Sequence, residues 1–143
     1  MPLKIIDHGS KEYQQMIALR TDILRKPLGL TYDPKVLELE KNDILLGAFE
    51  DDQIMACCIL SKFNESTCQL RQMAVHQSMQ RNGVGAALMN FAEHMARDNG
   101  YKFMMMHARA TAVGFYEKLG YKIEGDVFEE VTIPHYEMKK PLI

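Results

Sequence analysis

The chain has 143 residues and a mass of 16.4 kDa, the size of one average domain. Its hydrophobic fraction of 47% and charged fraction of 25% are those of a globular protein, which excludes disorder over most of the chain. With 17 Lys and Arg against 19 Asp and Glu, the net charge is −2, and this balance disfavours a dedicated nucleic-acid binder. We expect one domain spanning residues 1–143.

The first half of the chain should form a short strand, two helices and an antiparallel meander. Leu3–Asp7 is the expected first strand, and Ser10 is a helix N-cap in front of an apolar stripe that should end near Lys26, before Pro27. A loop then leads to Asp33-Pro34, which opens a short helix through Leu39. Turns at Asp51-Asp52 and Asn64–Ser66 separate three expected strands, Ile44–Glu50, Gln53–Lys62 and Thr67–Val75.

The second half alternates strands and helices. An apolar face predicts a helix from Gly83 to about Asp98, ended by Asn99-Gly100. The strand Tyr101–His107 is apolar on both faces at Phe103–Met106, which predicts a central parallel strand covered by helices on each side. A helix over Ala112–Leu119, capped by Gly120, and the strands Tyr121–Glu124 and Thr132–Met138 complete the chain. The predicted fold class is mixed α/β, an antiparallel meander followed by β-α-β-α-β.

The three cysteines, Cys57, Cys58 and Cys68, lack the spacing of a tetrahedral metal site, so we expect reduced, buried thiols and no metal. The longest apolar run, Ile54–Leu60, is far shorter than the roughly 20 residues of a membrane helix, and Met1–Tyr13 carries no stretch typical of a signal peptide. We therefore expect a cytoplasmic protein without a membrane partner.

The segment Gln80–Ala86 has the features of an anion-binding turn. It follows the strand end Met73–Val75 and leads directly into a helix, whose first amides lack internal partners and whose dipole favours negative charge. Gly83 and Gly85 let the backbone approach a ligand, and Arg81 adds a positive charge. A dinucleotide fingerprint would need glycine at the position of Leu88, and no P-loop ending occurs. A Gly-x-Gly turn before a helix also occurs in proteins as a purely structural turn that binds no ligand.

This segment, Gln80-Arg81-Asn82-Gly83-Val84-Gly85-Ala86, resembles the Gln/Arg-x-x-Gly-x-Gly/Ala signature of the GCN5-related N-acetyltransferases, the GNAT family. Downstream, Ala112 and Phe115-Tyr116-Glu117-Lys118-Leu119-Gly120-Tyr121 resemble the family's second motif, Ala-x-x-Phe/Leu-Tyr-x-Lys-x-Gly-Phe/Tyr. The resemblance extends over almost the whole chain, and Ile133-Pro134-His135 resembles a small bacterial subgroup. It implies a GNAT-like acyl-CoA N-acyltransferase fold and acetyl-CoA as cosubstrate.

The resemblance also implies roles for individual residues. Backbone groups of Met73 and Val75 would pair with the pantetheine arm, the amides from Arg81 to Ala86 would take the pyrophosphate, and the strand Met73–Val75 would splay from the central strand to leave a V-shaped slot for the thioester. Tyr116 would lie near the sulfur, where its hydroxyl can protonate the departing thiolate. The residues assigned to the cofactor are Met73, Ala74, Val75, Gln80, Arg81, Asn82, Gly83, Val84, Gly85, Ala86, Arg109, Phe115 and Lys118. An acceptor contact is the alternative for Arg109, and a solvated position is the alternative for Lys118.

An amine must lose a proton before it attacks a thioester, and for a lysine-like amine with a pKa of about 10.4 this costs roughly 4.6 kcal/mol at pH 7. Gln69 stands where histone-modifying relatives place a glutamate base, and an amide cannot take this role. We take His135 as the second catalytic candidate, with His107 as an alternative base and purely structural roles open for both. Glu129 and Glu130 are further candidates for the base; otherwise this pair is a solvated charge run or attracts a cationic substrate. The acceptor side could be lined by Arg20, Arg25 and Arg71.

The sequence thus favours an acetyl-CoA-dependent N-acetyltransferase that moves an acetyl group to a primary amine of a small molecule or peptide by direct attack. Because Gln69 stands in place of a glutamate base, the alternative hypothesis is a non-catalytic acyl-CoA binding or sensing module. A nucleotide-binding protein of another fold is a third hypothesis. A homodimer is a common default for a chain of this size.

Overall fold

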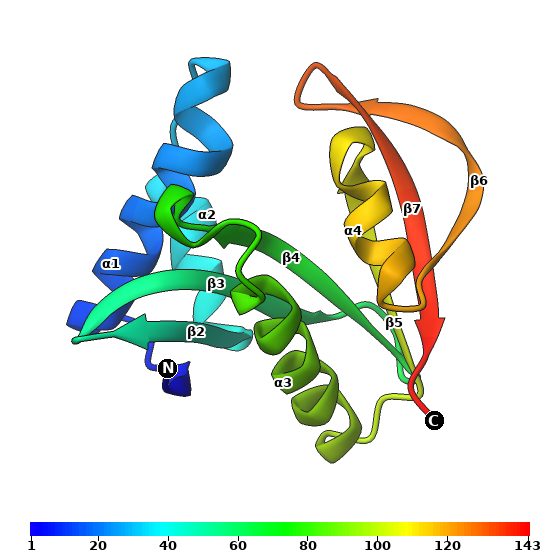
Figure 1. Cartoon of the computed structure of the whole chain (residues 1–143), viewed down its shortest axis with the longest axis horizontal. Coiled ribbons are helices and arrows are strands. Elements are labelled where there is room, and N and C mark those ends of the chain that lie inside the picture. Colours follow the sequence, from blue (N-terminus) through cyan, green and yellow to red (C-terminus); the bar gives the residue numbers. More distant parts are fainter.

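The computed structural model describes residues 1–143 and has at its centre one seven-stranded sheet in the order β1-β2-β3-β4-β5-β7-β6 (Figure 1). The first four strands are antiparallel, β4 and β5 are parallel, and β7 is antiparallel to both β5 and β6. This arrangement confirms the predicted mixed α/β class. The strands are β1 (Leu3–Ile6), β2 (Ile44–Glu50), β3 (Gln53–Lys62), β4 (Thr67–Val75), β5 (Phe103–Arg109), β6 (Lys122–Glu130) and β7 (Ile133–Pro141).

Four α-helices accompany the sheet: α1 (Lys11–Arg20), α2 (Pro34–Leu39), α3 (Val84–Asp98) and α4 (Val113–Lys118). The predicted N-caps are confirmed, because the Ser10 Oγ accepts from the Tyr13 amide at 3.1 Å and Asp33 accepts from the Lys35 amide at 2.9 Å. None of the helices has the length and apolar content that crossing a bilayer requires.

The first helical segment extends close to the predicted end near Lys26, but it is not a regular α-helix throughout. Its regular part ends at Arg20 and continues as a π-helical turn, η1 (Thr21–Arg25), and a 3₁₀ turn, η2 (Lys26–Leu28). The Thr21 hydroxyl donates back to the Ile17 carbonyl at 2.7 Å, a side-chain bond that competes with regular helix geometry. The wider η1 turn forms one wall of the cavity described below.

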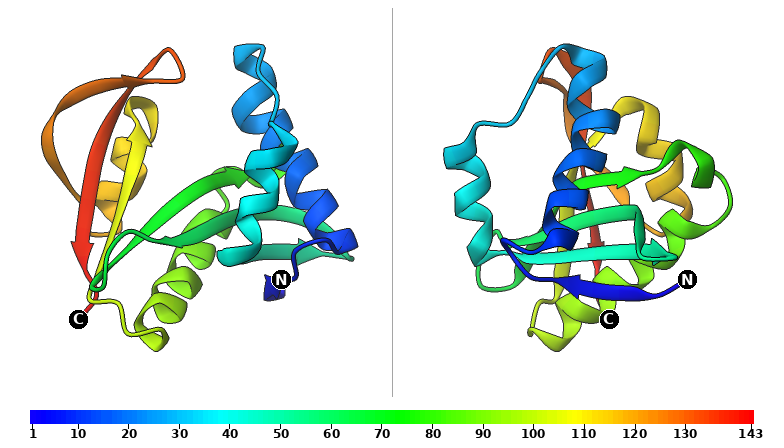
Figure 2. Two further views of the ribbon diagram at one scale, coloured as in Figure 1. Left: turned by 180° about the vertical axis from the view of Figure 1, so that it is seen from behind. Right: turned by 90° about the vertical axis from the view of Figure 1, so that its left-hand side faces the viewer.

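The two faces of the sheet carry separate cores, and Figure 2 shows the helices that lie on either side of the sheet. Helices α3 and α4 pack on one face and α1 packs on the other, so alternate residues of one strand enter different clusters. On β3, Cys58 belongs to the cluster under α3, and Cys57 belongs to the cluster under α1. All three cysteines are buried free thiols, as the sequence predicts, and burial raises the pKa of Cys57 to about 12.

Strand β5 matches the prediction only in part. Met104 and Met106 enter the core under α3 and α4, and β5 pairs in parallel with β4. Its other neighbour, β7, is antiparallel, and the buried Met105 on the opposite face lies outside the α1 cluster, which draws on β1 to β4. The expectation of helices on both faces of β5 is therefore wrong, because α1 packs on β3 and β4.

The last two strands are longer than predicted. Strand β6 runs to Glu130 and bulges between Glu124 and Phe128, where Gly125 has φ +83°. It is the edge strand of the sheet and almost all of its residues are exposed, so it lacks the apolar alternation by which a half-buried strand is detected.

Strands β4 and β5 pair only over their first halves. The register joins Thr67–Leu70 to Phe103–Met106 and stops there, and the strands then diverge (Figure 1). A bulge against β3 places Gln72 at φ +55° within the diverging part of β4. The splay that the family resemblance implied is therefore present.

Candidate active site

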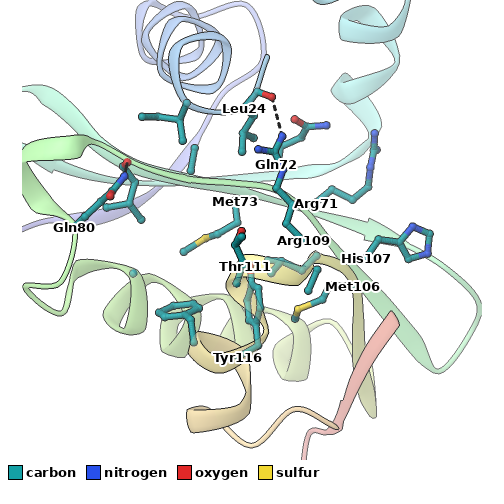
Figure 3. A pocket seen from close by; sticks show the side chains of 18 of the residues that line it. Leu24, Arg71, Gln72, Met73, Gln80, Met106, His107, Arg109, Thr111 and Tyr116 are labelled. Carbon is teal, nitrogen blue, oxygen red and sulfur yellow. Dashed lines mark hydrogen bonds between the residues drawn. The ribbon is translucent and has the colours of Figure 1, made fainter. Parts of the chain in front are cut away.

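A cavity of about 910 Å³ occupies the space between the diverging strands (Figure 3). It extends from the turn before α3 to the tip of the β6–β7 hairpin. Asn82 and Val84 do not line it, because the Asn82 side chain turns to the Met79 sulfur and Val84 packs in the core. The other sequence-predicted site residues do line it: Met73, Ala74, Val75, Gln80, Arg81, Gly83, Gly85, Ala86, Arg109, Phe115, Tyr116, Lys118 and His135.

The turn before α3 presents a row of backbone donors. The amides of Arg81, Gly83, Val84, Gly85 and Ala86 have no hydrogen-bond acceptor within the protein, and the next amide, of Ala87, bonds to the Gly83 carbonyl at 3.0 Å. Such donors at the positive end of a 15-residue helix dipole attract anions.

Backbone conformation explains the glycines of this turn. Gly83 has φ +89°, a conformation that side chains rarely adopt, and a Cβ atom on Gly85 would lie 3.2 Å from the Phe115 ring. Gln80 Nε2 donates to the Val75 carbonyl at 3.2 Å and so fastens the turn to the end of β4. The Gln80 side chain therefore shapes the turn.

The wall opposite this turn comes from α4. Tyr116 is 6% exposed and lines the cavity, yet its hydroxyl has no hydrogen-bond partner in the protein. Burial raises the pKa of Tyr116, so the phenol is protonated at neutral pH. Phe115 packs edge-on against the Tyr116 ring at 5.0 Å between centroids, and Lys118 is exposed at the rim.

The side of the cavity formed by η1 is basic. Arg25 donates through Nε and Nη2 to the Thr31 carbonyl at 3.3 and 2.8 Å. Arg109, at the end of β5, donates through Nη2 to the Leu24 carbonyl at 2.7 Å and so joins β5 to η1 (Figure 3). Burial lowers the pKa of Arg109, and the charge of Arg25 lowers it further. Arg20 does not line the cavity, because its fully buried guanidinium pairs with Glu40.

A cluster of two histidines and a carboxylate lies at the hairpin end of the cavity. His107 Nδ1 is 3.0 Å from one oxygen of Glu130, and His135 Nε2 is 3.7 Å from the other. The Phe128 ring packs between the two imidazoles. His135 is 3% exposed and its Nδ1 lies 2.9 Å from the Ile133 carbonyl, which can only accept, so this nitrogen carries a hydrogen. Glu129 does not line the cavity, and Glu130 is the member of the predicted pair that does.

Residues 32–142 match the family description "Acetyltransferase (GNAT) domain". The chain belongs to the GNAT acetyltransferase family. It is 23% identical to the uncharacterised N-acetyltransferase YjcF of Bacillus subtilis over 137 residues, which are 95% of this chain and 97% of YjcF. It is 30% identical to the protein YyaT of the same organism over 76 residues, or 53% of this chain and 51% of YyaT. The chain thus spans about half the length of some curated relatives it matches.

Several solved structures share the fold. An aminoglycoside 6'-N-acetyltransferase complexed with coenzyme A is 19% identical, with a TM-score of 0.81 over 100% of this chain and 98% of its own. ElaA of Escherichia coli is 17% identical, with a TM-score of 0.82 over 98% of this chain and 99% of its own. The predicted family and fold are therefore confirmed.

Some residues that shape this GNAT site gave no signal in the sequence. Tyr32 donates its hydroxyl to Gln72 Oε1 at 2.7 Å, which ties the loop after η2 to the bulge of β4. The Tyr32 ring also packs under the guanidinium of Arg25, 4.7 Å from the ring centroid. Tyr32 is 40 residues from Gln72 in sequence, and only pairing information could have joined them.

Proposed function

We propose that this GNAT domain is an acetyl-CoA-dependent N-acetyltransferase that acts on a primary amine by direct attack. The observation that carries the proposal is the row of five partnerless amides, from Arg81 to Ala86 with Asn82 excepted, beside a splayed strand pair and a buried phenol. Amides at a helix start suit a pyrophosphate, and an extended slot suits a pantetheine arm.

The chain's residues fit coenzyme A. The free amides and Arg81 would hold the phosphates, and Lys118 at the rim would add a second positive charge. The edge of β4 beyond Leu70 has no partner strand, so the backbone groups of Met73 and the amide of Val75 remain available for the pantetheine arm, while the Val75 carbonyl already accepts from Gln80. Ala74 faces the α1 cluster and contributes through its backbone.

The bound thioester supplies a carbonyl carbon with which a neutral amine forms a C–N bond, while the C–S bond breaks and the amine loses a proton. Tyr116 is the group that would protonate the leaving thiolate, since its hydroxyl is buried, protonated and free of protein partners. A phenol with a raised pKa is a weak acid toward a thiolate, so it would give up its proton only as the C–S bond breaks.

The proton of the amine would leave through His107. Its Nδ1 faces the carboxylate of Glu130, which can only accept, so the neutral ring carries its hydrogen there and Nε2 is left as the proton acceptor. His135 lies on the buried side of this pair, with its Nε2 3.7 Å from the other oxygen of Glu130. This cluster supplies the base that Gln69 cannot provide.

The deciding experiment combines calorimetry with coenzyme A and a coupled assay of free CoA in the presence of acetyl-CoA and a pooled amine library. An N-acetyltransferase binds coenzyme A and releases it only when an amine is present. Tight binding without release across the library would support the acyl-CoA sensing module. The absence of any binding heat would refute both.

A further inference from the structure

The charged residues that line the cavity are unevenly distributed. Arg81 and Lys118 belong to the end where α3 begins. Toward η1 and the end of β5 the lining side chains are Arg25, Arg71 and Arg109, and the one lining carboxylate, Glu130, is engaged with the two histidines. The side of the cavity formed by η1 and the end of β5 therefore carries an excess of positive charge that the proposed cofactor contacts do not use, and we take it as the acceptor side.

Two of these guanidinium groups have no counterion in the protein. Arg71 lies 3.8 Å from Asp43, but neither Arg25 nor Arg109 forms an ion pair. Their protein partners are the neutral carbonyls of Thr31 and Leu24. Arg109 is half-buried, and a guanidinium whose hydrogen-bond partner is a neutral carbonyl retains much of the cost of its desolvation.

The two groups also repel each other. The positive charge of Arg25 adds to burial in lowering the pKa of Arg109, so both charges act across the same partly buried space. An anion placed between them would relieve this repulsion and replace lost hydration.

Both side chains are held in place before any ligand binds. Arg25 stacks over Tyr32, and Tyr32 is fixed to the β4 bulge through Gln72. Arg109 is fixed by its bond to Leu24 across the splay. Each guanidinium keeps further N–H donors beyond these bonds, since it has five. Preorganised donors bind an anion with little loss of side-chain entropy.

Resting on the proposed function, we propose that the acceptor is an amine that also carries a carboxylate, such as an amino acid or a short peptide, and that Arg25 and Arg109 bind this carboxylate. The acceptor wall then selects by charge, and polycationic amines are excluded by the same two arginines.

The test compares matched acceptors with acetyl-CoA: a panel of amino acids, the carboxamides of the same amino acids, and spermidine as a polycation. Each pair shares its amine and differs by the carboxylate. We expect kcat/KM to be at least about tenfold higher for the acids, and spermidine to be the poorest acceptor. Equal use of acids and carboxamides, or preference for spermidine, overturns the inference while leaving the acetyltransferase proposal intact.

Two variants locate the effect. Arg109→Gln and Arg25→Gln should each raise KM for the acids about tenfold and leave KM for the carboxamides within about twofold. Lys26→Gln removes a charge from the exposed neighbour of Arg25 and should change neither. Equal effects on acids and carboxamides would show a structural role and contradict the assignment. Circular dichroism checks that each variant folds.

A binding experiment separates the two proposals. Calorimetry in the presence of coenzyme A should show that N-acetylated amino acids, the expected products, bind more tightly than their carboxamides, and that Arg109→Gln removes the difference. If coenzyme A binds and neither product form does, the carboxylate site is refuted. If coenzyme A itself does not bind, the proposed function fails first.

Discussion

Arg20 and Glu40 form a bidentate ion pair in the protein interior, with Nη1 2.7 Å from Oε1 and Nη2 2.8 Å from Oε2. Both side chains are almost completely buried, at 0% and 2% exposure, and the Tyr13 hydroxyl donates to the same carboxylate at 2.7 Å. The pair joins the end of α1 to the turn before β2, and η1 follows α1 directly. It therefore positions the wall that carries Arg25.

Breaking this pair should strongly destabilise the fold. Glu40→Gln leaves a buried guanidinium without its counterion, and we expect the free energy of unfolding to fall by about 3–5 kcal/mol. Urea denaturation measures the loss. Glu38→Gln is the matched control, since Glu38 forms an exposed pair with Lys41 and should cost less than about 1 kcal/mol. Equal losses of unfolding free energy in the two variants would show that the buried pair stabilises the fold no more than an exposed pair does.

The same carboxylate should make stability depend on acid pH. Burial by itself raises the pKa of Glu40, but the hydrogen bonds from Arg20 and Tyr13 outweigh it, and the net pKa lies below the ordinary value of about 4.3. Because the pKa of the carboxyl is lower in the folded than in the unfolded protein, ionised Glu40 stabilises the fold. This contribution is complete above about pH 4.3 and is lost as the pH falls through the folded-state pKa. Unfolding free energies measured from pH 7 to pH 3 should fall steeply in the acid range, and less steeply in Glu40→Gln.

Tyr116→Phe tests the proposed acid. We expect kcat with an accepted amine to fall by about tenfold to a hundredfold, because a general acid is removed, while the dissociation constant of acetyl-CoA changes less than about twofold. Tyr101→Phe serves as control, because Tyr101 does not line the cavity. Unchanged turnover across the pH range would remove Tyr116 from the mechanism.

Glu130→Gln tests the proposed proton acceptor. The variant keeps a hydrogen-bond acceptor for His107 and removes the negative charge beside its ring, so kcat/KM at pH 7 should fall by about tenfold or more. The loss should shrink at higher pH, where more of the amine is already neutral. Glu129→Gln changes the adjacent carboxylate outside the cavity and should leave the pH profile unaltered. A parallel response of both variants would point to a general charge effect.

Gly83→Val tests the anion site. At φ +89° a β-branched residue is strained by roughly 1–2 kcal/mol or more, so the turn must rearrange and its amides no longer converge. We expect coenzyme A affinity to fall at least about tenfold in calorimetry, which is the effect of 1.4 kcal/mol. Gly114→Ala, on α4 with open space around it and no positive φ, should bind coenzyme A normally. Normal binding by Gly83→Val would refute the assignment of the pyrophosphate to this turn.

Local patterns predicted much of the fold. The strands Ile44–Glu50, Gln53–Lys62 and Thr67–Val75 follow their predicted bounds, because apolar runs between strong turn signals leave little choice of register. Helix α3 and its end at Asn99-Gly100 follow from a single apolar face and a C-cap. The extent of β6 could not be predicted, since an exposed edge strand carries no burial pattern.

The sequence by itself determined the family and the turn before α3, because both depend on residues adjacent in the chain, from Gln80 to Ala86, whose glycines and helix start act locally. Only the tertiary structure decided which distant side chains meet in or around the cavity. It buried Arg20 against Glu40, placed Arg109 on the Leu24 carbonyl 85 residues away, and joined His107 to Glu130 across the β6–β7 hairpin. These contacts depend on where β4 and β5 stop pairing, and sheet divergence is a property of long-range packing that local spacing does not encode.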